Sequence, residues 1–162
     1  MPKLIVKEGD KIEQGAPVFH SKKDPRILFV SSVAGVVKHI VRGAKRKILK
    51  IVVEQKDWEI ISHKIPTLKS LSRESIIEIL LKSGAWPFIK QRPYGIIADP
   101  DSIPKAIYVS TFTSAPLDVD FQFLLKNHKD DFQNGIDILN ALSDAPLVCL
   151  LYTSDAADDR VS

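Results

Sequence analysis

Two stretches decide the fold of the first part of the chain: VKEGDKIEQGAPVF at residues 6–19 and VAGVVKHI at residues 33–40. Both place β-branched residues beside glycines, and Gly9 stands where a tight turn requires a positive φ. Working outward, short strands are predicted at residues 4–7, 17–19, 27–30, 35–41 and 47–54. Strands of this length and spacing predict a small sandwich or barrel over residues 1–55.

The apolar pattern changes after a polar linker at residues 56–70. A helix is predicted to begin after the N-cap Ser72 and to end before Gly84, which suits the C′ position. Leu71 is predicted to pack on Ile76 as a hydrophobic staple. The helix would carry an apolar stripe and an exposed ion pair, formed by Ile76, Ile77, Leu80 and Leu81 and by Glu78 with Lys82.

The remainder of the chain alternates between strand and helix. A buried strand is predicted at residues 105–111 and a further strand at residues 145–148. Between them lies a helix with Asp130 or Asp131 as its cap, and its apolar positions are Phe132, Ile136 and Leu139. The order helix, strand, helix, strand predicts the start of an α/β layered domain over residues 71–148.

The composition excludes several classes of protein. Apolar residues make up 44% and charged residues 27% of the 162, as in ordinary soluble globular proteins. No stretch approaches the roughly 18 consecutive apolar residues of a membrane-spanning helix, and the first residues carry charge too early for a signal peptide. The single cysteine, Cys149, excludes a disulfide framework and a multi-cysteine metal site. These features predict a cytoplasmic protein.

The net charge of +3 is too small to imply nucleic acid as a partner, but its distribution is uneven. Basic residues gather in two short stretches: Lys22, Lys23 and Arg26, then Arg42, Lys45, Arg46, Lys47 and Lys50. Two interpretations stay open. The stretches are either a solvated basic face, or a surface for an acidic partner or for lipid headgroups.

The last residues, 149–162, follow no pattern set up before them. The run CLLYTSDAAD at residues 149–158 resembles one translated frame of a transposase adapter used in sequencing libraries. Residues 149–162 are therefore expected to be non-native. In that case Cys149 is no nucleophile and the native chain continues past Val148. The other interpretation is a native strand at residues 147–152.

The two stretches at residues 6–19 and 33–40 resemble the signatures of biotinyl and lipoyl carrier domains, V-K-x-G-D-x-V-x-x-G-x-x-L and P-V-A-G-x-V-x-x-I. The resemblance implies a barrel-sandwich hybrid fold. In the carriers a modified lysine stands at a hairpin tip, and that position falls on Asp24. Lys22 and Lys23 are near, but they are adjacent and off-register. The fold is thus expected to be kept and the carrier function lost, with a lysine-modified carrier as an alternative.

Further motifs resemble, in the same order, the A-subunit family of the bacterial sodium-translocating NADH:quinone reductase (Nqr). They are RGAKR at residues 42–46, IKQRPY at 89–94, PKAIYVS at 104–110 and FQNGID at 132–137. The matches span nearly all of residues 1–148 and are greatest to forms found in the Bacteroidetes. The resemblance implies a mixed β and α/β fold. A biotinyl/lipoyl-like barrel-sandwich hybrid without its first strand precedes the truncated start of a Rossmann-like α/β domain, together about the first third of such a protein.

The resemblance also implies a function. The chain would be an accessory subunit of a membrane respiratory complex that couples NADH oxidation and quinone reduction to sodium export. The fragment alone is expected to be non-catalytic and to hold no cofactor, whereas NAD, flavins, iron centres and quinone belong to the whole complex. Its partners would be the other subunits, chiefly the membrane subunit on the quinone side. It would lie peripherally on the cytoplasmic face of the inner membrane. The related subunit of the Rnf electron-transport complex shares this domain order and remains an alternative.

No catalytic or metal-binding residues are predicted. The histidines show no ligand spacing and are expected at the surface or half-buried; they are His20, His39, His63 and His128. Asp99, Asp101 and Asp120 lie among prolines and are predicted to be turn or cap residues. Trp86 and Phe88 are predicted to pack at the exit of the first helix.

Five residues are candidates for docking to a partner: Arg42, Lys45, Arg46, Arg92 and Tyr94. An arginine fork beside a glycine suits carboxylates and polar headgroups, because the backbone can approach the partner closely. For Arg42 and Arg92 the alternative is an internal salt bridge that ties a turn to the core.

Overall fold

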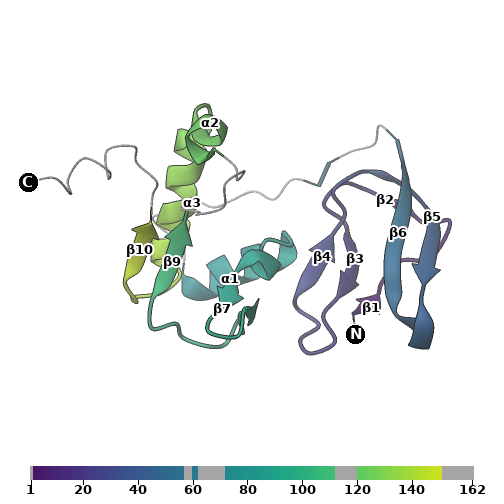
Figure 1. Ribbon diagram of the computed structural model, residues 1–162, viewed down its shortest axis with the longest axis horizontal. Helices are drawn as coiled ribbons and strands as arrows, with labels where there is room; N and C mark the ends of the chain where they lie inside the picture. The colour runs from purple at the N-terminus through teal and green to yellow at the C-terminus, as the bar shows by residue number, and fades with distance from the viewer. Residues whose placement is uncertain (1, 57–59, 62–71, 112–119, 151–162) are drawn as a thin grey trace, which may run out of the picture. The chain divides into compact units, whose positions relative to one another are not determined.

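The computed structural model describes residues 2–56, 60–61, 72–111 and 120–150. Contacts divide the chain into two compact units, the first formed by residues 1–66 and 77–102 and the second by residues 67–76 and 103–162. Strands dominate the beginning of the chain, and helices alternate with strands after residue 72 (Figure 1). The predicted mixture of β and α/β structure is therefore present.

Two three-stranded antiparallel sheets form the β part of the first unit, with the orders β1-β3-β4 and β2-β5-β6 (Figure 1). The strands are β1 Lys3–Leu4, β2 Lys11–Ile12, β3 Pro17–His20, β4 Leu28–Val30, β5 Gly35–Arg42 and β6 Ile48–Gln55. Each predicted strand region contains an observed strand, and the short β2 is additional. It was missed because a two-residue strand beside a turn has too little pattern to detect.

The core of the β part draws on both sheets. Val6, Ile12, Val18 and Val37 are buried together, and Val37 is fully inaccessible. The partly buried side chains packed against them are Phe19, Ile40, Ile51 and Val53. The strands of the described residues do not close into a barrel, so this part is a sandwich around one shared core.

The pairing of β5 with β6 is the longest in the unit, and it depends on Gly35 at its start. A Cβ at Gly35 would collide with the carbonyl oxygen of Glu54, so only glycine lets the two backbones meet there. The register shifts twice, which leaves Lys38 on β5 and Leu49 on β6 as bulged residues. A bulge bends its strand and re-aims a side chain, and Leu49 is 61% exposed.

Helix α1, Arg73–Lys82, has the ends predicted from the sequence. The Ser75 amide donates to the Ser72 hydroxyl at 3.3 Å, which confirms Ser72 as the N-cap. Gly84 has a φ of +71°, as a C′ glycine requires. The predicted Lys82–Glu78 pair is formed at 2.6 Å. The predicted staple residue Leu71 lies outside the described residues.

The segment after α1 packs within the first unit. It contains the 3₁₀ turn η3, Trp86–Phe88, and the hairpin of β7, Lys90–Gln91, with β8, Ile96–Ile97. A Cβ at Gly84 would lie 2.6 Å from Cγ1 of Val30, so Gly84 lies directly against β4. Trp86 is 3% exposed and its indole N–H donates to the Ala98 carbonyl at 2.8 Å. Trp86 therefore packs as predicted, whereas the packing predicted for Phe88 is wrong, because that ring is 83% exposed.

The second unit contains a parallel strand pair, β9 Ile107–Ser110 with β10 Leu147–Leu150. Two helices connect these strands, α2 Phe121–Leu125 and α3 Lys129–Ala141. Parallel strands joined through helices are the unit from which α/β layered domains are built. The predicted α/β character is thus observed, and the short α2, capped by Asp120 at 3.1 Å from the Phe123 amide, is additional.

Two details of the second unit concern the start of α3 and the length of β10. The cap prediction for α3 is wrong: His128 is the N-cap residue, and Asp130 and Asp131 lie in the first turn. The Asp131 carboxylate lies 3.0 Å from the His128 ring. It is also in the first turn of the helix, where the helix dipole stabilises a negative charge. Strand β10 continues through Cys149 and Leu150, which pair with Val109 and Ser110. The origin of residues 149–162 stays a prediction, because backbone pairing does not depend on side chains.

Candidate functional site

The tip of the β3–β4 hairpin holds the position that corresponds to a carrier lysine. That position is Asp24, whose carboxylate lies 2.7 Å from the Arg26 guanidinium. The same guanidinium reaches Asp101 at 2.7 Å, and its two Nη atoms bond both oxygens of that carboxylate. We call Asp24, Arg26 and Asp101 the clasp, because they join the hairpin tip to the segment after β8.

Electrostatics within the clasp follows from these bonds. The side-chain hydrogen bond from Arg26 holds the pKa of Asp24 below its ordinary value. The pKa of Arg26 is raised, first by its hydrogen bond to Asp101 and then by that to Asp24. The carrier position is therefore occupied by a charged, internally satisfied carboxylate. Lys22 and Lys23 beside it are exposed.

The turn role predicted for Asp99 is confirmed, since its carboxylate accepts the Asp101 amide at 3.0 Å. Asp101 does more than the sequence predicted, because it also binds Arg26 across 75 positions of chain. No local signal in the sequence reports a pair that far apart, so the clasp was not predicted.

The end of the β5–β6 hairpin carries the largest group of cations. We call Arg42, Lys45, Arg46, Lys47 and Lys50 the basic tip; all five are exposed. The 3₁₀ turn η1, Ala44–Arg46, shapes it, closed by a hydrogen bond of 2.7 Å from the Gly43 amide to the Lys47 carbonyl. No carboxylate interrupts residues 25–53 of the sequence.

The backbone of the basic tip is strained. Lys45 and Arg46 have φ values of +54° and +59°, in the left-handed region that ordinary L residues avoid. Within the described part of the chain, none of the five cations forms an ion pair. The internal salt bridge considered for Arg42 is therefore absent from these residues, and the side chain is free for a partner.

The β7–β8 hairpin presents the second group of docking candidates. Its tip contains Arg92 and Tyr94, and the turn closes with the Gly95 amide on the Gln91 carbonyl at 3.0 Å. Tyr94 is 80% exposed and Arg92 is exposed. Arg92 also lacks an ion pair with any described residue, so the salt-bridge alternative does not hold there either. The docking candidates thus lie on two separate hairpins of the first unit.

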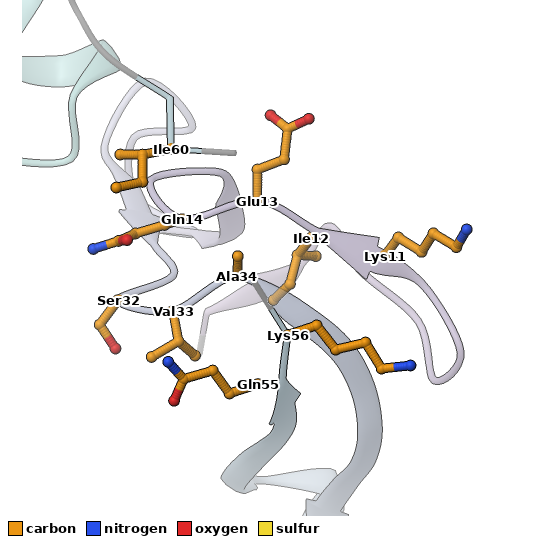
Figure 2. Close-up of a pocket in the computed structure, with 10 residues that line it drawn as sticks. All are labelled: Lys11, Ile12, Glu13, Gln14, Ser32, Val33, Ala34, Gln55, Lys56 and Ile60. Carbon is orange, nitrogen blue, oxygen red and sulfur yellow. The ribbon is translucent and has the colours of Figure 1, made fainter. Parts of the chain in front are cut away.

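An open depression of about 910 Å³ lies where the turn after β2 meets the end of β6 (Figure 2). Ile12, Val33 and Ala34 contribute apolar lining, whereas the charged ends of Lys11 and Lys56 point to the right in the view and that of Glu13 points upward (Figure 2). A small-molecule site instead brings a few polar groups to one point. We assign no ligand to this depression.

Among the described residues, no group of histidine, cysteine and acidic side chains could hold a metal ion. His20 is half-buried and His39 and His128 are exposed, as predicted, whereas His63 lies outside the described residues. No helix within the described ranges has both the length and the apolar character needed to cross a membrane.

Comparison with known proteins identifies relatives of both parts of the chain. Residues 1–56 match the family described as the NqrA N-terminal barrel-sandwich hybrid domain. Residues 71–160 match the NqrA second alpha/beta domain. These matches confirm the predicted fold class, and their limits lie close to the observed change from sandwich to alternating helices and strands.

Whole-chain relatives share one description, the A subunit of a Na(+)-translocating NADH-quinone reductase. The protein from Alcanivorax borkumensis is 33% identical over 153 residues, covering 91% of this chain and 34% of its own length. The protein from Histophilus somni strain 2336 is 32% identical over 149 residues, covering 90% of this chain and 33% of its own. The protein from Tolumonas auensis is 33% identical over 153 residues. The chain spans about a third of the length of these relatives.

Proposed function

This chain belongs to the NqrA family, and from that premise we propose that it forms the docking part of an accessory subunit in a sodium-translocating NADH–quinone reductase. The complex would couple NADH oxidation and quinone reduction to sodium export. The chain would contribute no complete active site. NAD, flavins, iron centres and quinone would be held by the complex as a whole.

The observation that carries this proposal is the basic tip. Five exposed cations lie in or beside a strained turn, without an internal partner among the described residues. Left-handed backbone at a lysine and an arginine costs free energy that a glycine would avoid. Strain that persists in a turn is a recognised mark of functional positions, here a prepared recognition surface.

The clasp supports the same proposal because it disfavours the main alternative, a lysine-modified carrier. A carrier domain needs one exposed lysine at the β3–β4 tip, and the clasp places a paired aspartate there. The barrel-sandwich hybrid is therefore used as a scaffold for docking. The proposed partners are the other subunits, chiefly the membrane subunit on the quinone side, with the chain on the cytoplasmic face of the inner membrane.

The β7–β8 hairpin would supply a second contact to those subunits. Tyr94 at its tip and Phe88 in the preceding turn η3 offer large exposed rings, and Arg92 offers a planar fork for carboxylates. Tyrosine, phenylalanine and arginine are enriched at protein–protein interfaces, whereas lysine is depleted. This hairpin thus has the composition of a protein contact.

The test is to replace Arg42 and Arg46 by glutamine in the full-length protein and to measure co-purification with the rest of the complex in detergent. We expect most of the co-purifying complex to be lost. The matched control is Lys22→Gln with Lys23→Gln, which removes the same charge from the other hairpin and should leave assembly intact. Undiminished assembly of the Arg42 and Arg46 variant would overturn the proposal.

A further inference from the structure

The basic tip also contains an exposed leucine, so it has an apolar feature in addition to its charge. Leu49 is the bulged residue of β6 and is 61% exposed. It lies against the turn itself, since a Cβ at Gly43 would be 3.1 Å from its Cδ1 atom. The hairpin end therefore presents one exposed apolar side chain with cations on both sides of it in the sequence.

We propose that the tip of the β5–β6 hairpin binds an anionic membrane surface, with its lysines on lipid headgroups and Leu49 at the boundary of the acyl chains. An apolar side chain ringed by Lys and Arg is the chemistry of an interfacial membrane contact. Basic residues next to an anionic leaflet are attracted over about one Debye length. The inference rests on the proposed function, in which the chain works beside a membrane.

The lysines of the tip favour lipid over an acidic protein as their occupant, whereas Arg42 and Arg46 are the groups proposed above for contact with the other subunits. Three of its five cations are lysines, namely Lys45, Lys47 and Lys50. Lysine is depleted at protein–protein interfaces, where arginine and aromatic residues are enriched. Lysine is a compact point charge that needs no fixed partner geometry, which suits a fluid array of headgroups. The β7–β8 hairpin has the opposite composition, with an arginine and exposed rings.

The tip can be altered without disturbing the fold. Lys47 has an ordinary extended backbone, with φ of −62° and ψ of 128°, and its turn hydrogen bonds use only main-chain atoms. Lys50 and Leu49 are exposed. Lys47→Gln with Lys50→Gln removes charge, and Leu49→Ser removes the apolar group, so the two parts of the proposal are tested separately.

The experiment measures co-sedimentation of the purified full-length protein with vesicles. One set contains phosphatidylcholine alone, and the other contains equal parts of phosphatidylcholine and phosphatidylglycerol. We expect binding only to the anionic vesicles, weakening as salt is raised. Loss of two cations should weaken partitioning about thirtyfold, from roughly 1 kcal/mol for each cation near the surface. Leu49→Ser should weaken it severalfold.

Two control variants match these changes elsewhere in the same unit. Lys22→Gln with Lys23→Gln removes the same charge, and Ile60→Ser removes an apolar side chain that is 67% exposed beyond the opposite end of β6. Both should bind as the unaltered protein does. Far-ultraviolet circular dichroism establishes that each variant is folded.

Three results would overturn the proposal: no binding to anionic vesicles, equal weakening by the control variants, or unchanged vesicle binding of the tip variants. If the tip variants bind vesicles normally but no longer assemble in detergent, the tip binds an acidic segment of another protein in the complex. Assembly in detergent contains no bilayer, so failure of the lipid inference is distinguishable from failure of the proposed docking function.

Discussion

Two hairpins of the same sandwich differ in how the arginines at their tips are compensated. At the β3–β4 tip, Arg26 lies between two aspartates and its charge is compensated internally. At the β5–β6 tip, five cations extend without a partner among the described residues, and the turn below them is strained. Both tips are short basic stretches between strands in the sequence, although the first also contains Asp24. Charge therefore identifies a candidate surface, but only the position of the counter-charges tells a structural tip from one that can bind a partner.

The largest expected effect concerns how the segment after α1 packs against β4 of the first hairpin. Gly84→Ala places a Cβ 2.6 Å from Val30 on β4, at a φ of +71°. Left-handed strain and overpacking together should lower the free energy of unfolding by about 2–4 kcal/mol. Chemical denaturation followed by circular dichroism measures it. Gly95→Ala is the control, because its φ is +63° but nothing lies within 4 Å of the added Cβ. A loss as large at Gly95 would show that packing on β4 adds nothing.

The next prediction tests the clasp through the pKa of Asp24 and the pH dependence of stability. Arg26→Gln should return the pKa of Asp24 upward toward its ordinary value near 3.8, as followed by nuclear magnetic resonance of the carboxyl carbon. The folded-state pKa of Asp24 is depressed, so its stabilising contribution is present above the unfolded value and is lost as pH falls through the folded value. The unaltered chain should therefore exceed the variant in stability at neutral pH, with the difference shrinking in acid below about pH 4.

The control for the clasp is Lys38→Gln. Lys38 pairs with Glu54 at 2.9 Å on the surface of β5 and β6 and lowers the pKa of that carboxyl. This variant should leave the titration of Asp24 unchanged. An Asp24 pKa that does not move in Arg26→Gln would mean that the clasp does not persist in solution.

The sequence predicts more of the fold than of the candidate site. Local signals carried the fold: the Ser72 cap, Gly84 and the glycine of VAGV all act through neighbours within a few residues or through backbone sterics. The docking candidates, four cations and Tyr94, are exposed, and their docking role stays a prediction. The clasp was not, because Arg26 and Asp101 meet only after folding. The bulge at Leu49 was also missed, since a register shift depends on the partner strand.

A smaller effect separates strain from charge at the β5–β6 tip. Lys45→Gly relieves a left-handed backbone at φ +54° and should raise the free energy of unfolding by about 0.5–1 kcal/mol. The same variant should bind anionic vesicles more weakly, since it loses one cation. Lys22→Gly, at the clasped tip, should give no stabilisation, because no residue described there has a positive φ. If Lys45→Gly is destabilising, the strain at the basic tip is not present in solution.

The last prediction is that the lysines of the β3–β4 tip are not modified covalently. Expression with excess biotin and lipoate, followed by intact mass spectrometry, should show no adduct on Lys22 or Lys23. A modifying ligase reads the geometry of one exposed lysine at a hairpin tip, and here two adjacent lysines flank a position filled by Asp24. The ion pairs of Arg26 with Asp24 and Asp101 also hold that tip against the segment after β8. An adduct on either lysine would support the carrier function. The distinction between the two tips would then fail, because both tips would bind another protein.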